Sequence, residues 1–305
     1  MLTHQVEYYS EGELVRATWR TPDQVAGRLP AIIQGPGWFG LKEAKHHDRY
    51  HEAFTAAGFG VLCIDYRGFG ESEGERGRLS VNGQFEDLVN GVTYLTTRDD
   101  VDPEAVGAFG TGGTGGGNAV MLGALDSRVR AVVGQFPVAD GTDWLRRMRA
   151  EHEWLEYLAE LEADRRQRVR TGVSKRVNPR EEVMVQTPER RQSTFKSEVD
   201  SKIELSIPLA DVEGVLRYRP VAAAAGMRTP LMLIGVELDA TTPIEHAQAI
   251  YDVARGPRRL LIQRHTSHYA AYQQYAAQVI PQIVDWFGAH LRGPGDIVVV
   301  SDDPR

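Results

Sequence analysis

The sequence predicts an α/β fold in which a mostly parallel central sheet is flanked by helices. Short apolar runs, rich in valine, leucine and isoleucine, alternate along the chain with stretches of helical periodicity. Several of these runs are apolar throughout, which is typical of parallel strands buried on both faces. The repeated alternation of strand and helix therefore indicates one sheet covered on both sides.

The elements can be placed in order along the chain. The first twenty residues alternate polar and apolar side chains around Glu11-Gly12, which predicts an antiparallel hairpin. The expected strands after it are 31–33, 61–65, 106–109, 131–135, 230–234 and 259–262, and the expected helices are 51–57, 82–96, 118–125 and a last helix ending near Leu291.

The alternation stops between residues 142 and 218. This stretch is rich in charge, with arginine clusters among glutamates, and its first part carries large apolar residues at helical spacing. We therefore expect a mainly helical cap at 142–218, inserted into one α/β core made of 1–141 and 219–292. A C-terminal tail is expected at 293–305.

Composition narrows the classes of function. The net charge of −7 argues against nucleic acid or an anionic membrane as a partner, because both attract basic surfaces. Cys63 is the only cysteine, which excludes an internal disulfide, and its apolar neighbours predict a buried, unreactive thiol. No signal peptide pattern is present, and no apolar run approaches the roughly 20 residues of a membrane span. We expect a cytoplasmic protein without metal or cofactor, and the sequence is compatible with a homodimer.

Two ionisable residues follow predicted strands at positions suited to acid–base chemistry. Asp239 lies a few residues beyond one strand, and His268 follows the last apolar strand. Ligand sites gather at the carboxyl ends of parallel strands, so both side chains are expected there. A carboxylate bonded to one ring nitrogen would fix the tautomer and leave the other nitrogen as a base. Glu237 and Asp140 are weaker candidates for the acid, and His265 is the rival histidine.

A third signal is the loop after strand 106–109, where six of the eight residues from 110 to 117 are glycine. Glycines permit the strained strand-to-helix turn that exposes a nucleophile in the pattern G-x-S-x-G. Here the nucleophile position falls at Gly112, or at Gly113 if counted back from the helix, and neither has a side chain. Nucleotide binding is disfavoured, because there is no Walker lysine and the G-x-G-x-x-G spacing lacks its early strand and acid.

Together with these loops, two further motifs carry a resemblance to a known family. They are GWFGLKE at residues 37–43 and DYRGFGESEG at residues 65–74, of which the second is expected to be structural. Across nearly the whole chain the sequence resembles the α/β-hydrolase superfamily, in the branch of acyl hydrolases and transferases related to X-Pro dipeptidyl-peptidases. Pro36 departs from the family pattern, which usually has histidine there.

The resemblance implies an α/β-hydrolase fold and a catalytic pair of Asp239 and His268. It also implies an oxyanion hole made by the backbone amides of Trp38 and Gly113. Because these donors are main-chain groups, the loss of a serine side chain does not remove them.

The glycine at the nucleophile position leaves four hypotheses for the reaction. In the first, His268 and Asp239 act as a general base on water or on an acidic substrate proton. That fits hydrolysis by water, C–C or C–X cleavage, and lyase or isomerase chemistry on a small carbonyl compound. In the second, Thr114, or Thr111, is the nucleophile of a hydrolase or acyltransferase. The third is a non-catalytic ligand-binding protein, and the fourth a serine hydrolase whose native serine has been changed to Gly112. We favour the first, because the base and the backbone donors are retained.

The cap is expected to shape the substrate pocket. Trp144, Trp154 and Tyr157 are candidates for lining an apolar pocket around a small carbonyl or acyl substrate, although aromatic residues at helical spacing also serve as core. His46 and His47 follow the predicted oxyanion loop and are interpreted as a surface pair, since no third metal ligand is in view.

Overall fold

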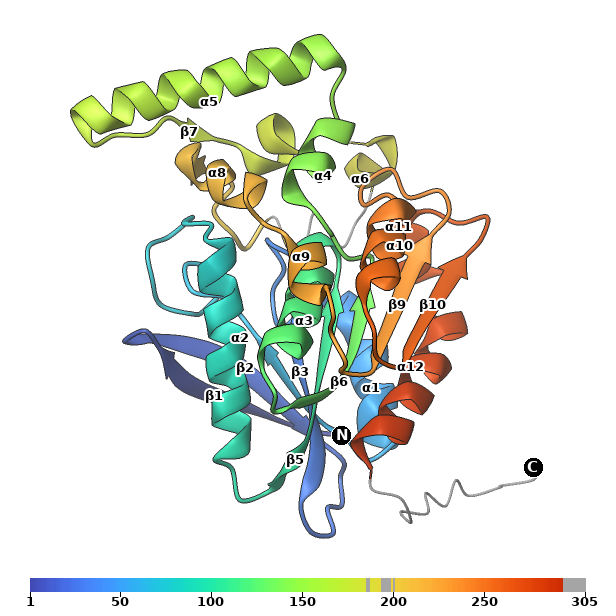
Figure 1. Cartoon of the computed structure of the whole chain (residues 1–305). Helices are drawn as coiled ribbons and strands as arrows, with labels where there is room; N and C mark the ends of the chain where they lie inside the picture. Colours follow the sequence, from blue (N-terminus) through green and yellow to red (C-terminus); the bar gives the residue numbers. More distant parts are fainter. Residues whose placement is uncertain (185–186, 193–198, 200, 293–305) are drawn as a thin grey trace.

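The computed structural model describes residues 1–184, 187–192, 199 and 201–292, and it has the predicted α/β architecture (Figure 1). One eight-stranded sheet runs in the order β1-β2-β4-β3-β5-β6-β9-β10. β2 is antiparallel to both β1 and β4, and the pairs from β4 to β10 are parallel. The strands are β1 (Leu2–Ser10), β2 (Glu13–Thr21), β3 (Leu29–Gly35), β4 (Gly60–Ile64), β5 (Val101–Thr111), β6 (Val129–Gln135), β9 (Leu231–Val236) and β10 (Arg258–Gln263).

Helices cover both faces of this sheet, as predicted (Figure 1). Successive strand residues enter opposite layers: Leu233 joins the apolar cluster on one face, and Met232 joins the cluster on the other. The first face carries α2 (Val81–Thr96), α3 (Gly113–Leu125) and α10 (Ile244–Val253), and the second carries α1 (Asp48–Ala56) and α12 (Ala276–Leu291). Among the described residues, no helix is long and apolar enough to cross a membrane.

Two smaller predictions are confirmed. The N-terminal hairpin turns at Glu11 and Gly12, whose φ angles of 47° and 87° are those of a tight two-residue turn. Cys63 is buried in β4, and its burial raises the pKa of the thiol to about 12, so the thiol stays protonated.

Helix α3 begins at Gly113, five residues before the predicted start and inside the glycine run. Each glycine lowers helix propensity by about 1 kcal/mol, which is why the sequence pattern places the start later. A Cβ on Gly115 would lie 2.7 Å from the Pro36 carbonyl oxygen, and one on Gly116 would lie 2.9 Å from the carbonyl oxygen of Gln135. Close packing of the first helical turn against the strand ends therefore requires glycine and overrides the propensity.

We call residues 142–218, between β6 and β9, the cap segment. In Figure 1 its long helix α5 (Glu151–Thr171) lies at the top, above the end of the sheet toward which the arrowheads of β9 and β10 point. The other elements around it are α4 (Gly141–Arg147), β7 (Arg176–Val177), a π-helical turn (Pro179–Val183), α6 (Pro188–Gln192), β8 (Ile207–Pro208), α8 (Ala210–Leu216) and α9 (Pro220–Ala224).

Asp211 on α8 joins the cap segment to the core and makes stability depend on pH. Its carboxylate accepts a hydrogen bond from the Leu79 amide at 2.7 Å and lies 3.2 Å from Arg78 Nε. Burial nevertheless raises the pKa of Asp211 to about 6, with Glu75 acting in the same direction. Because this folded-state pKa lies above the usual value of about 3.9, ionisation of Asp211 costs stability as pH rises from about 4 through 6.

Asp211→Asn removes this ionisation and keeps an oxygen for the Leu79 amide. We expect the free energy of unfolding of the variant, relative to wild type, to rise between pH 4.5 and pH 7. Urea denaturation at the two pH values measures the difference, and a difference that does not change with pH would contradict the assignment.

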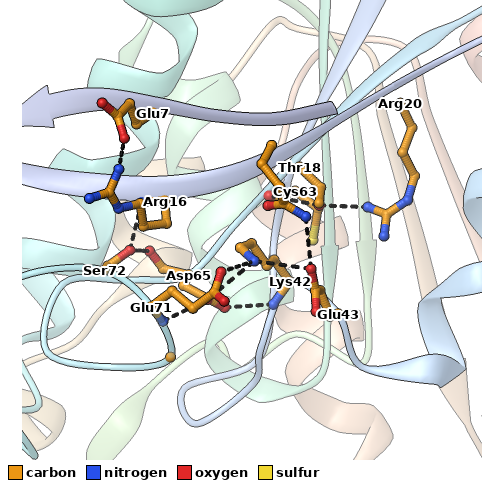
Figure 2. A network of polar contacts seen from close by, with 12 residues as sticks. Glu7, Arg16, Thr18, Arg20, Lys42, Glu43, Cys63, Asp65, Glu71 and Ser72 are labelled. Carbon is orange, nitrogen blue, oxygen red and sulfur yellow. Dashed lines mark hydrogen bonds and ion pairs between the residues drawn. The ribbon is translucent and has the colours of Figure 1, made fainter. Parts of the chain in front are cut away.

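Asp65 braces the loop after β3 against the loop after β4 (Figure 2). Its carboxylate accepts hydrogen bonds from the backbone amides of Lys42 at 2.7 Å and Glu71 at 3.0 Å, and Lys42 Nζ donates to the Glu71 carboxylate at 2.6 Å. The Ser72 hydroxyl donates to the Asp65 carbonyl oxygen at 2.6 Å. The DYRGFGESEG motif therefore holds residues 37–43, the predicted oxyanion loop, in place.

Candidate active site

His268 and Asp239 meet at the carboxyl end of the sheet. His268 is the first residue of the short helix α11 (His268–Gln273), and its Nδ1 lies 2.7 Å from Asp239 Oδ2. The other carboxylate oxygen of Asp239 accepts hydrogen bonds from the amides of Thr241 and Thr242, at 2.8 and 2.7 Å. Both ionisable side chains are buried. A carboxylate held in this way favours the tautomer with a proton on Nδ1, which leaves Nε2 as the base.

The other candidates for the acid and for the histidine have different partners. The His265 side chain is largely exposed, and its backbone amide donates to Glu237 at 2.8 Å. Asp140 accepts a hydrogen bond from the Asp143 amide at the start of α4 and lies 3.0 Å from Arg219 Nε. These carboxylates are occupied at loop and helix ends, so the geometry assigns Asp239 to His268.

Gly112 lies at the apex of the turn between β5 and α3. Its φ of 68° and ψ of 154° fall in a region that is essentially restricted to glycine. Its amide donates to the Gln135 carbonyl oxygen at 3.0 Å. Since Gly113 is already the first residue of α3, the position that a nucleophile would take is Gly112. The nearest atom to a Cβ built on Gly112 is the Tyr272 hydroxyl oxygen, at 3.3 Å.

The backbone amides of Trp38 and Gly113 are the candidates for an oxyanion hole. The loop of Gly37 and Trp38 passes beside the turn, and a Cβ built on Gly37 would lie 3.9 Å from Gly112 Cα. Gln84 Nε2 donates to the Trp38 carbonyl oxygen at 2.9 Å and fixes that loop. Within the described part of the chain, the amides of Trp38 and Gly113 donate no hydrogen bond. Gly113 begins α3, so the positive end of that helix dipole adds to the affinity of its amide for an anion.

A cavity joins these groups. The space that it offers to the centres of water molecules is about 40 Å³. Its lining residues come from the loop of residues 37–43, the glycine turn, the cap segment and the loops that carry Asp239 and His268, and they include Gly37, Trp38, Gly112, Gly113, Thr114, Trp144, Arg180, Met184, Thr242, His268 and Tyr269.

The predicted pocket aromatics separate in the structure. Trp144 lines the cavity, donates from Nε1 to the Thr241 carbonyl oxygen at 2.8 Å and packs edge-on against Trp38. Trp154 and Tyr157 pack against each other on α5 and are absent from the described lining of the cavity. Their helical spacing reflects packing within the cap segment.

The two threonines of the glycine loop and the pair of His46 and His47 are also placed by the structure. Thr114, the second residue of α3, is buried and lines the cavity. Thr111 ends β5, and its hydroxyl lies 3.3 Å from Nε2 of His47. His47 is 1% exposed, so the interpretation of His46 and His47 as a surface pair is wrong for His47. The turn Lys45–His47 folds inward behind the glycine turn, which sequence spacing does not reveal.

Glu189 on α6 of the cap segment holds the histidine loop, and no sequence pattern pointed to this glutamate. Its carboxylate accepts hydrogen bonds from the Ser267 hydroxyl and from the amides of Tyr269 and Ala270, both at 3.2 Å. Amides in the first turn of a helix have no acceptor within the helix, so a glutamate from a distant segment caps the helix that begins with His268.

Glu189→Ala should therefore lower stability by about 1 kcal/mol, the usual effect of losing a helix cap, and should lower kcat because His268 loses its support. Thermal unfolding and ester hydrolysis measure the two effects. Glu181→Ala, at an exposed glutamate of the same segment, is the control. Equal kcat values for the two variants would contradict a positioning role for Glu189.

Comparisons with known proteins agree with this geometry. Residues 11–270 match the model of the X-Pro dipeptidyl-peptidase (S15) family. An uncharacterised 31.7 kDa protein of Escherichia coli, from the traX-finO intergenic region, is 30% identical over 289 residues, covering 92% of this chain and 97% of its own. The acyltransferase drtE of Aspergillus calidoustus is 24% identical over 287 residues, covering 88% and 89%.

Among solved structures, the α/β hydrolase GrgF from Penicillium sp. sh18 superposes with a TM-score of 0.77 at 22% identity, over 95% of this chain and 99% of its own. The predicted fold class is thus confirmed, and so is the resemblance drawn from the sequence motifs. A match over most of the length, on a sheet of this topology, means that the chain belongs to the X-Pro dipeptidyl-peptidase (S15) family of α/β hydrolases and is an enzyme of the hydrolase type.

Proposed function

We propose that the enzyme acts on the carbonyl group of a small molecule with His268 as a general base and without a serine nucleophile. Asp239 orients the imidazole, and the backbone amides of Trp38 and Gly113 hold the developing oxyanion. The observation that carries the proposal is the combination at one site of a buried His268–Asp239 pair at 2.7 Å and a glycine at the apex of the turn.

The proposed chemistry follows from what each group can do. His268 Nε2 accepts a proton from water or from an acidic carbon of the substrate, and the Asp239 carboxylate stabilises the imidazolium that forms. The carbonyl oxygen gains negative charge in either case, and the amides of Trp38, in the loop after β3, and Gly113, at the start of α3, stabilise it. Hydrolysis by water, C–C or C–X cleavage, and lyase or isomerase reactions share this step.

The alternatives are less well supported by the local geometry. Thr114 is held in the first turn of α3, beyond the apex, and its branched side chain is buried there. A native serine at residue 112 would be strained in this backbone conformation, because φ of 68° with ψ of 154° is essentially a glycine conformation.

A fluorophosphonate probe and acyl substrates test the proposal. The panel is p-nitrophenyl acetate and butyrate, with the butanoyl thioester of N-acetylcysteamine included because a relative is an acyltransferase. We expect turnover without covalent labelling of the protein. Labelling at Thr114, abolished in Thr114→Val, would overturn the proposal in favour of a threonine nucleophile. Absence of turnover across the panel would overturn hydrolysis and leave lyase or isomerase chemistry.

A further inference from the structure

The hydroxyl of Tyr272 lies beside the position that a nucleophilic side chain would take. Tyr272 follows His268 by four residues on α11, so the two side chains share one face of the helix. Their rings are 5.4 Å apart between centroids and nearly perpendicular. The Tyr272 oxygen is 3.3 Å from a Cβ built on Gly112, which is close enough to bond an atom placed where a serine oxygen would be.

Packing holds this hydroxyl in place. Tyr272 is 4% exposed, and its ring contacts Phe136 at 5.0 Å and His46 at 5.3 Å between centroids, both in edge-on geometry. A tyrosine ring has few rotatable bonds, so a packed ring fixes its oxygen well. The oxygen therefore has a defined position relative to His268 and Gly112.

The protonation state of Tyr272 limits its role. Burial raises its pKa well above the ordinary value, and the nearby Tyr50 and Asp239 act in the same direction. A hydrogen bond with the Gly112 backbone opposes this rise but does not cancel it. Tyr272 is therefore a neutral phenol at physiological pH and cannot serve as the base. Its oxygen has two lone pairs, so a neutral Tyr272 can act as a hydrogen-bond acceptor.

We propose that Tyr272 and His268 together hold the attacking water beside Gly112, in the space that a nucleophilic side chain would fill. The inference rests on the proposed general-base function and specifies hydrolysis. One water proton points to His268 Nε2 and the other to the Tyr272 oxygen, which directs a lone pair at the substrate carbonyl. The cavity that Gly112 lines has about 40 Å³ open to water centres, and a single water needs about 10–15 Å³.

The proposed hydrolysis needs only water and the ester as reactants. The water oxygen bonds to the carbonyl carbon while His268 takes a proton, and the π-electron pair moves to the oxygen held by the amides. When the intermediate collapses, the bond to the leaving group breaks and the leaving group takes that proton from His268. An ester and water give an acid and an alcohol, and Tyr272 is unchanged.

Tyr272→Phe tests the placement of the water with p-nitrophenyl butyrate as substrate. We expect kcat to fall by about 10²-fold, the scale of a misplaced reactant, with KM unchanged. Added hydroxylamine competes with water, and the ratio of hydroxamate to acid should rise, because the variant handicaps water alone. Tyr8→Phe is the control, since it removes a buried hydroxyl bonded to the Asp87 carbonyl oxygen, on the other face of the sheet. An unchanged kcat or an unchanged product ratio would overturn the proposal.

Gly112→Ala fills the same space without touching the base. We expect hydrolysis to fall by more than about 10²-fold. Gly172→Ala is the matched control, because Gly172 also has a positive φ, of 74°, and a Cβ there would meet no atom within 4 Å. Full activity of folded Gly112→Ala would overturn the proposal.

Crystal structures of wild type and Tyr272→Phe supply a readout that does not need turnover. The wild type should show an ordered water within hydrogen-bond distance of both His268 Nε2 and the Tyr272 oxygen, and the variant should lose it. If wild type hydrolyses none of the panel, hydrolysis is overturned as the reaction, whereas the crystal structure still shows whether the water is bound. Its absence from wild type would overturn the present inference.

Discussion

Replacing His268 with alanine is expected to lower kcat/KM for acyl substrates by about 10²- to 10⁴-fold, the contribution of a positioned general base. The reason is that His268 lines the cavity shared by Trp38 and Gly113, and its Nδ1 is bonded to Asp239, which leaves Nε2 as the base. Initial rates with p-nitrophenyl butyrate measure the effect. Imidazole added to the buffer should restore part of the rate, because it can enter the space that the side chain leaves.

Two controls keep the His268→Ala result interpretable. The variant leaves the buried Asp239 without its partner, so its unfolding must be measured to show that the protein is folded. His265→Ala removes an exposed histidine from the same loop and should keep wild-type kcat/KM. If His268→Ala retained more than a tenth of wild-type activity while folded, the general-base role would be wrong.

Gly112→Ser is expected to turn the enzyme into one that forms a covalent intermediate. The positive φ of 68° at this residue puts a new side chain at the apex of the turn, next to the Tyr272 hydroxyl at 3.3 Å from Cβ. A hydroxyl beside a histidine base is an activated nucleophile. We expect stoichiometric labelling by a fluorophosphonate and a burst of p-nitrophenol, neither of which wild type should show. The strained backbone should lower stability by about 1–3 kcal/mol.

Mass spectrometry of labelled peptides locates the adduct in Gly112→Ser. The double variant Gly112→Ser with His268→Ala should not label, since the new hydroxyl then lacks its base. A folded Gly112→Ser protein that resists the probe would show that residue 112 does not occupy the nucleophile position of the family.

Much of the site was predictable because its parts follow strands. Asp239 and His268 come after β9 and β10, and the sheet topology alone brings strand ends together. The glycine run also follows a strand, and it predicted a tight turn at that position. Its helix start was misplaced by five residues, because local propensity counts against glycine and only the contacts of Gly115 and Gly116 show why glycine is needed there.

The side chains that sequence reasoning missed contact residues that are far away in the sequence. Glu189 reaches the start of α11 from the cap segment, about 80 residues earlier. Arg180, in the charge-rich segment 142–218, is buried in the cavity wall over the Phe39 ring. Tyr272 lies only four residues after His268 in the sequence, but only the fold places its hydroxyl against Gly112. No pattern of periodicity or spacing carries such contacts.

The glycine turn also bears on how such an enzyme can evolve. A Cβ on Gly110 would lie 1.9 Å from the Gly115 carbonyl oxygen, and one on Gly117 would lie 2.5 Å from the Tyr218 hydroxyl. At Gly112 the nearest contact is 3.3 Å. Contacts thus close Gly110 and Gly117 to any side chain, whereas at Gly112 there is room and only the positive φ opposes one. Exchange between covalent and water-based chemistry would therefore take one residue and tolerance of about 1–3 kcal/mol of backbone strain.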